Sequence, residues 1–175
     1  MSEIPAADRI AEWHKKLPKG WKQAAVDTRG RWTMSCASLL DLRTSANNDE
    51  ASEKCLVATS TGSIELDLAT YLSDPKDIDG DGRGDVIVGL RSENVAALGF
   101  VVLSDRATGV IELQNDSVQV GAAEWHGAWG TKAGKTVIDV LFVGGGWVDP
   151  NGVVVPGEQQ KYSLGWNGAS LSPLE

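Results

Sequence analysis

After its first twenty residues the chain is a succession of short apolar runs separated by turn residues. Most of these runs either alternate apolar with polar residues or are apolar throughout, and they are too short for ordinary helices. The runs are WKQAAV, RWTMSCASLL, KCLVAT, SIELDL, DVIVGL, ALGFVVLS, VIELQ, SVQVG, TVIDVLFVGG, GVVVP and KYSLGW. Parallel neighbours need crossovers of a dozen or more residues, for which the chain has little room. The pattern therefore predicts a mainly β fold, an antiparallel sandwich or a strongly curved sheet.

One amphipathic helix is expected before this β body. Ile10, Trp13 and Leu17 recur at helical spacing, and Pro5 suits a first turn, so the helix should span about residues 5–17. The β body should then run over about residues 20–175, and with no linker in sight the 175 residues are predicted to form a single domain. The segment SIELDLATYL is ambiguous between a strand and a strand that runs into a turn of helix.

An aspartate-rich loop, residues 77–85, precedes the run VIVGL. Carboxylates placed this close together repel one another unless a cation lies between them. Gly82 occupies the sixth position, where calcium loops turn sharply, while position 12 is Val88 rather than the glutamate of an EF-hand. The candidate ligands are the carboxylates at positions 1, 3, 5 and 9 and the main-chain carbonyl at position 7: Asp77, Asp79, Asp81, Asp85 and Arg83.

The pattern D-x-D-x-D-G-x-x-D followed by a β-branched strand resembles the calcium loops of FG-GAP and VCBS repeats, best known from integrin-type β-propellers. The resemblance implies that the same five residues hold a Ca²⁺ ion. It does not imply a propeller, because a propeller needs at least four blades and this chain has one such loop. The closing YSLGWNGASL looks like a terminal hairpin of secreted bacterial envelope proteins, which implies a bacterial envelope setting.

The two cysteines, Cys36 and Cys55, lie at the edges of apolar runs that flank a polar loop. They are expected to form a disulfide, the alternative being two buried thiols in a cytosolic core. Calcium loops of this kind are saturated where calcium is about millimolar, so both features favour a secreted or cell-envelope protein. No apolar run approaches the roughly 20 residues needed to span a bilayer. The first residues show no export signal, so the start is either native or follows a trimmed signal.

The partner is expected to be a protein or glycan of the cell surface. The net charge of −8 and the scattered basic residues argue against nucleic acid. Three of the seven tryptophans, Trp125, Trp129 and Trp147, lie among glycines and either fill the core or form an exposed platform for a sugar or protein ligand.

The expected function is therefore that of a binding module with structural calcium, not of an enzyme. A carbohydrate-binding module that uses the tryptophans is one alternative. A hydrolase that uses His126 with Glu124, and Asp139 as a third group, is another. His14 is expected to be solvated on the helix, and GTKAGKT to be a hairpin turn rather than a phosphate loop.

Overall fold

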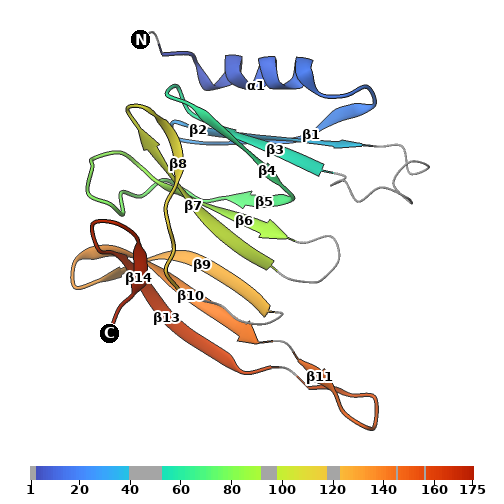
Figure 1. Ribbon diagram of the computed structural model, residues 1–175, viewed down its shortest axis with the longest axis vertical. Coiled ribbons are helices and arrows are strands. Elements are labelled where there is room, and N and C mark those ends of the chain that lie inside the picture. Colours follow the sequence, from blue (N-terminus) through green and yellow to red (C-terminus); the bar gives the residue numbers. More distant parts are fainter. Residues whose placement is uncertain (1–2, 40–52, 92–97, 118–122, 145, 156) are drawn as a thin grey trace.

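The computed structural model describes residues 3–39, 53–91, 98–117, 123–144, 146–155 and 157–175. One helix and three four-stranded sheets follow one another in chain order along the long axis of the molecule (Figure 1). Every pair of neighbouring strands is antiparallel. The prediction of a mainly β, antiparallel fold with one N-terminal helix is therefore confirmed.

The layers are built from consecutive parts of the chain. The helix is α1 (Ala6–Lys16). The first sheet contains β1 (Trp21–Arg29), β2 (Trp32–Leu39), β3 (Glu53–Ala58) and β4 (Ser63–Asp67), in that order. The second contains β5 (Ala69–Leu72), β6 (Val86–Arg91), β7 (Leu98–Arg106) and β8 (Gly109–Glu112), again in chain order. The third has the order β14 (Leu171–Pro173), β13 (Gln159–Trp166), β10 (Lys135–Gly144), β9 (Ala123–Lys132). A separate hairpin joins β11 (Trp147–Val148) to β12 (Val154–Val155).

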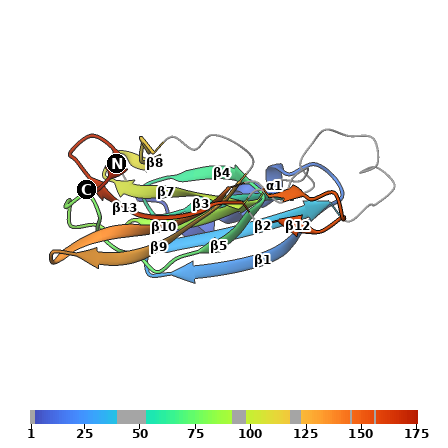
Figure 2. The ribbon, with the colours of Figure 1, turned by 90° about the horizontal axis from the view of Figure 1, so that it is seen from below.

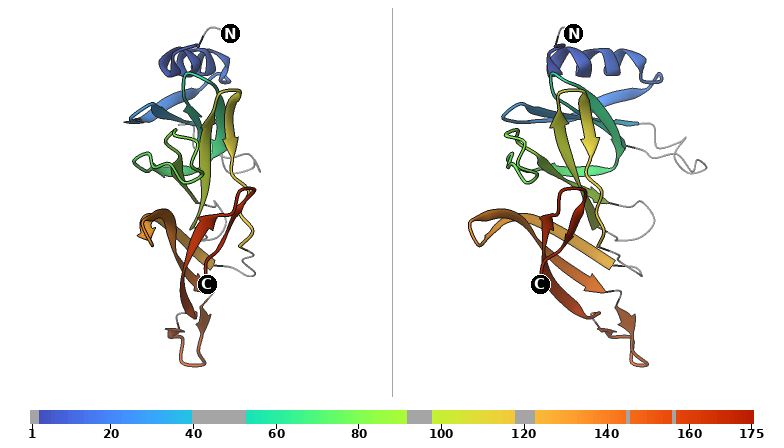
Figure 3. Two further views of the ribbon diagram at one scale, coloured as in Figure 1. Left: turned by 90° about the vertical axis from the view of Figure 1, so that its left-hand side faces the viewer. Right: turned by 60° about the vertical axis from the view of Figure 1, so that its left-hand side comes forward.

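The sheets pack face to face with their strands running in roughly the same direction, as the view from below shows (Figure 2). The side views show the same order of layers and the β11–β12 hairpin beyond the third sheet (Figure 3). The helix covers the outer face of the first sheet, where Ile10 packs with Leu56 and Ala58.

The middle sheet is buried on both faces, which explains why β6 is apolar without alternation. Val86 and Val88 join Trp32 and Met34 in the core between the first and second sheets. Ile87 points the other way, into the core between the second and third sheets. All three residues of this run are fully buried.

Strand β9 was not predicted, because its sequence AEWHGAWGTK contains two glycines that weaken a strand pattern. Close packing accounts for both of them. A Cβ at Gly127 would lie 2.8 Å from the ring of Phe100 in the second sheet. A Cβ at Gly130 would lie 2.2 Å from a carboxylate oxygen of Asp139 on the neighbouring strand. The glycines let β9 approach both neighbours.

The segment SIELDLATYL contains no helical turn. It forms two strands, β4 and β5, which belong to different sheets and meet at Leu68. Leu68 is buried and has a positive φ of 55°, a conformation that L residues rarely adopt. This corner carries the chain from the first sheet to the second.

The expectation for His14 is also wrong, because its Nε2 lies 2.9 Å from the hydroxyl of the buried Ser35. The helix packs close enough to the first sheet to cover this ring partly. The segment GTKAGKT is a hairpin turn as predicted, with Ala133 and Gly134 at φ values of 51° and 77° between β9 and β10. Most of the predicted strand SVQVG lies outside the described residues.

The disulfide between Cys36 and Cys55 is confirmed. The two cysteines face each other directly across β2 and β3, and both are buried in the core of the first two sheets. No helix among the described residues is long and apolar enough to cross a membrane.

Candidate metal centre

The aspartate-rich loop connects β5 to β6 and is closed by a pair of main-chain hydrogen bonds. The amide of Lys76 donates to the carbonyl of Asp85 at 2.9 Å, and the amide of Asp85 donates to the carbonyl of Lys76 at 2.8 Å. Inside this closure Gly80 and Gly82 have φ values of 78° and 80°. A Cβ at either position would meet no atom within 4 Å, so backbone conformation rather than crowding makes glycine the favoured residue.

Main-chain amides of the loop orient its carboxylates. Asp77 accepts from Gly80 at 2.7 Å and from Gly82 at 2.9 Å. Asp79 accepts from the amide of Asp81 at 3.2 Å, and Asp81 accepts from that of Arg83 at 2.8 Å. Each carboxylate oxygen has a second lone pair, so these bonds fix the side chains and leave acceptor capacity for a cation.

Asp85 is the most confined of the four carboxylates. It is fully buried, and its Oδ2 accepts from the amide of Ile78 at 2.9 Å. None of the described residues donates a hydrogen bond to its Oδ1. Burial raises the pKa of Asp85 to about 6, against the opposing effect of the hydrogen bond from the amide of Ile78. A buried carboxylate oxygen without a hydrogen-bond donor keeps its full acceptor capacity, which a cation could use.

Three of the predicted carboxylates converge. Asp77, Asp79 and Asp85 each offer an oxygen, and these oxygens lie within 4.8 Å of one another. Hard cations such as Ca²⁺ take six to eight oxygen ligands, including carboxylates and main-chain carbonyls. The donor set and the orphaned oxygen therefore fit a calcium ion.

The other two predicted ligands lie at the edge of this cluster. Asp81 is not one of the three converging carboxylates, and its side chain is 24% exposed. Arg83 keeps the seventh position in the loop, the position of the main-chain ligand in the predicted set. Its guanidinium lies 3.6 Å from a carboxylate oxygen of Asp105.

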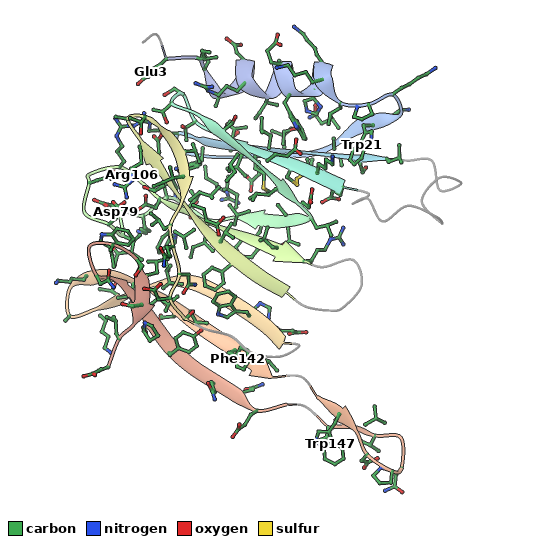
Figure 4. The ribbon with its side chains drawn as sticks, viewed as in Figure 1. Glu3, Trp21, Asp79, Arg106, Phe142 and Trp147 are labelled. Carbon is green, nitrogen blue, oxygen red and sulfur yellow. A yellow bond between two sulfur atoms is a disulfide. The ribbon has the colours of Figure 1, made fainter. Side chains whose placement is uncertain are left out.

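The end of strand β7 supplies partners that the sequence did not predict. Ser104 donates from its hydroxyl to Oδ2 of Asp79 at 3.2 Å. Arg106 forms ion pairs with Asp79 and with Asp81, the latter at 3.4 Å. Figure 4 shows Arg106 and Asp79 pointing toward each other. The triplet SDR at the end of β7 has no sequence spacing that ties it to a loop about twenty residues earlier, so no sequence signal revealed these contacts.

Asp105, which lies between Ser104 and Arg106 in β7, points toward the first sheet. Its Oδ1 accepts hydrogen bonds from the hydroxyls of Thr59, at 2.9 Å, and Thr61. Arg31 lies 3.5 Å from its Oδ2. Asp105 therefore links the first sheet to the loop through Arg83.

A cavity of about 690 Å³ lies beside the loop and is lined by Asp77, Asp79, the β9–β10 turn and Trp166. The loop carboxylates are thus adjacent to open space. Two of the three residues whose carboxylates converge, Asp77 and Asp79, therefore line this cavity.

The structure does not bring the three candidate tryptophans together on one exposed surface. Trp125 packs on Phe100, with ring centroids 4.6 Å apart, and Trp129 donates to the carbonyl of Asp74 at 2.7 Å. Both are partly buried against the core of the second and third sheets. Trp147 is 59% exposed on the β11–β12 hairpin, which lies beyond the third sheet (Figure 4), whereas Trp125 and Trp129 lie on β9 within that sheet.

His126 and Glu124 lie in contact, 3.3 Å apart. Their side chains are 43% and 46% exposed, on the opposite face of β9 from the two packed tryptophans. Asp139, the third residue of this alternative, accepts a hydrogen bond from Ser163 at 2.9 Å.

Comparison with known proteins finds no matching family model, curated protein or solved structure.

Proposed function

We propose that this chain is an extracytoplasmic β domain that binds one calcium ion in the loop 77–85 and acts as an interaction module. The observation that carries the proposal is the fully buried Asp85, whose carboxylate clusters with those of Asp77 and Asp79. Its Oδ1 has no hydrogen-bond donor among the described residues. A divalent cation would neutralise these carboxylates, which otherwise repel one another.

Calcium fits this donor set better than a transition metal does. The cluster offers carboxylates but neither imidazole nor thiolate, the ligands that zinc and copper prefer. Asp77, Asp79, Asp85 and the carbonyl of Arg83 would hold the ion, with Asp81 at the exposed side. The ion's part is structural: it would stiffen a loop whose carboxylates also contact the end of β7.

An extracytoplasmic location is supported by the disulfide and agrees with the proposed calcium site. Disulfides persist in oxidising compartments, and this chain buries one between neighbouring strands. Calcium sites of modest affinity are saturated outside the cytosol, where the ion is about millimolar.

The β11–β12 hairpin is the best supported contact surface. Trp147, Val148 and Val153 are 59%, 62% and 57% exposed, and they lie on one short hairpin beyond the third sheet. Exposed clusters of large apolar side chains often mark interaction sites. A single exposed ring flanked by valines suits an apolar pocket on a surface protein better than the face of a glycan. The partner class that we propose is therefore a protein.

Isothermal titration with calcium tests the metal site. Wild type should bind one equivalent, and Asp77→Asn should weaken binding at least tenfold, because it removes a charge from the cluster. Asp67→Asn, an exposed change on β4, is the matched control and should bind as wild type does. No heat of binding from wild type at millimolar calcium would refute the proposal.

A hydrolase remains the alternative that one contact favours, the Glu124–His126 pair at 3.3 Å. Turnover of glycan, ester or peptide substrates that is lost in His126→Gln would replace the binding proposal with the enzymatic one.

A further inference from the structure

Arg106 forms ion pairs with two of the carboxylates that are predicted to bind calcium. Its guanidinium contacts Asp79, whose side chain is only 1% exposed, and it also reaches Asp81 at 3.4 Å. Asp79 is one of the three carboxylates that converge with Asp85. One positive side chain is therefore shared between two of the predicted calcium ligands.

The arginine is not fixed from its other side. Its side chain is 29% exposed, and its buried Nε has no acceptor among the residues that the structure describes. By contrast, the neighbouring Asp105 has two hydroxyl donors and two arginines around it. Among the described residues, the Arg106 guanidinium forms its ion pairs with the loop carboxylates of Asp79 and Asp81, and its partial exposure gives it access to solvent.

A guanidinium and a divalent cation that share a carboxylate repel each other and compete for the same oxygens. We propose that Arg106 is the built-in countercharge of the calcium-free loop: it holds Asp79 and Asp81 in place without the ion and lowers the affinity for calcium. This inference rests on the proposed calcium site. It assigns Arg106 a positioning role that sets the calcium concentration at which the loop fills.

The test is calcium titration and thermal melting of Arg106→Gln beside wild type. Removal of one positive charge near a divalent site should lower the calcium dissociation constant about tenfold. Without its countercharge the loop should be weaker, so the variant should melt below wild type in chelator. This difference in melting temperature should shrink in saturating calcium, because the ion then supplies the charge.

Arg91→Gln is the matched control. Arg91 pairs with Glu53 at 3.7 Å on another part of the molecule, and its loss should leave calcium affinity unchanged. Arg106→Lys serves if the glutamine variant does not fold in chelator. Lysine is a point charge without the guanidinium fork, so it should contact the two carboxylates less well and give an affinity between those of wild type and the glutamine variant.

The outcomes separate the two proposals. Equal or weaker calcium binding by Arg106→Gln and Arg106→Lys, with normal binding by wild type, would overturn the role of Arg106 and leave the calcium site standing. Failure of wild type and both variants to bind calcium would overturn the site itself.

Discussion

Substitution of Asp85 by asparagine should raise the stability of the calcium-free protein and remove the stabilisation that calcium provides. The wild-type carboxylate is fully buried, and one of its oxygens has no hydrogen-bond donor among the described residues, so its ionisation in the calcium-free fold is unfavourable. Asparagine keeps an oxygen that can accept from the amide of Ile78 and removes the charge. We therefore expect Asp85→Asn to stabilise the calcium-free protein and to abolish its stabilisation by calcium.

The magnitude follows from the pKa of Asp85. Burial raises this pKa from an ordinary 3.8 to about 6. One pKa unit corresponds to about 1.4 kcal/mol, so ionisation of Asp85 costs the fold about 3 kcal/mol at pH 8. The asparagine variant should recover up to that amount of unfolding free energy in chelator.

The effect should depend on pH with a defined sign. Because the folded state binds this proton more tightly than the unfolded chain does, the calcium-free wild type should lose stability as pH rises from about 4 to about 7. Asp85→Asn should show a flatter profile, and the two proteins should converge below about pH 4, where Asp85 is protonated in both states.

Urea denaturation in chelator and in millimolar calcium, at pH 4 and pH 8, measures all of these free energies. Asp67→Asn is the control for loss of one acidic charge. An Asp85→Asn variant that is less stable than wild type in chelator at pH 8, or that still gains stability from calcium, would refute the reasoning.

Further predictions follow from the packing. Loss of the Cys36–Cys55 bond, which spans 19 residues, should lower the free energy of unfolding by about 3 kcal/mol on reduction; unchanged urea curves in reductant would contradict this. Gly127→Ala should cost about 1–3 kcal/mol because its Cβ would meet Phe100 at 2.8 Å, whereas Gly99→Ala, with no atom within 4 Å, should be nearly neutral by the same assay. Trp147→Ala should change stability by less than about 0.5 kcal/mol because the ring is 59% exposed, yet it should reduce binding to arrayed surface proteins; a large loss of stability would show that the ring packs.

The sequence predicts the β class well because strands with one buried face show alternating apolar and polar residues. It does not predict the number of layers, because continuous apolarity in β6 indicates two covered faces without naming what covers them. In the structure, one face of β6 packs on Trp32, from far earlier in the chain, and the other on Ile138, from far later. Packing partners that lie this far apart along the chain cannot be predicted from the local sequence pattern.

Secondary-structure prediction from the local sequence fails where tertiary packing overrides the intrinsic preferences of the residues. The glycines of β9 weaken a strand pattern, but Gly127 admits the ring of Phe100 from another sheet. Leu68 has ordinary apolar character and nothing that marks the positive φ with which it turns the chain into the second sheet. Both features depend on neighbours that only the folded chain brings close.

The candidate site divides in the same way. The loop residues were predictable because a cation site needs oxygens at a fixed local spacing. Arg106 and Ser104 were not, because they reach Asp79 from a strand whose position depends on sheet pairing. The arginine that we propose as the countercharge of the loop therefore lies outside the sequence motif that predicts the calcium site.

A crystal structure of the protein grown in millimolar calcium, with anomalous diffraction to identify the ion, tests the central claim most directly. The proposal predicts one calcium peak in the loop, about 2.3–2.6 Å from carboxylate oxygens of Asp77, Asp79 and Asp85 and from the carbonyl oxygen of Arg83. A loop without a peak under these conditions, with Oδ1 of Asp85 still lacking a partner, would contradict it.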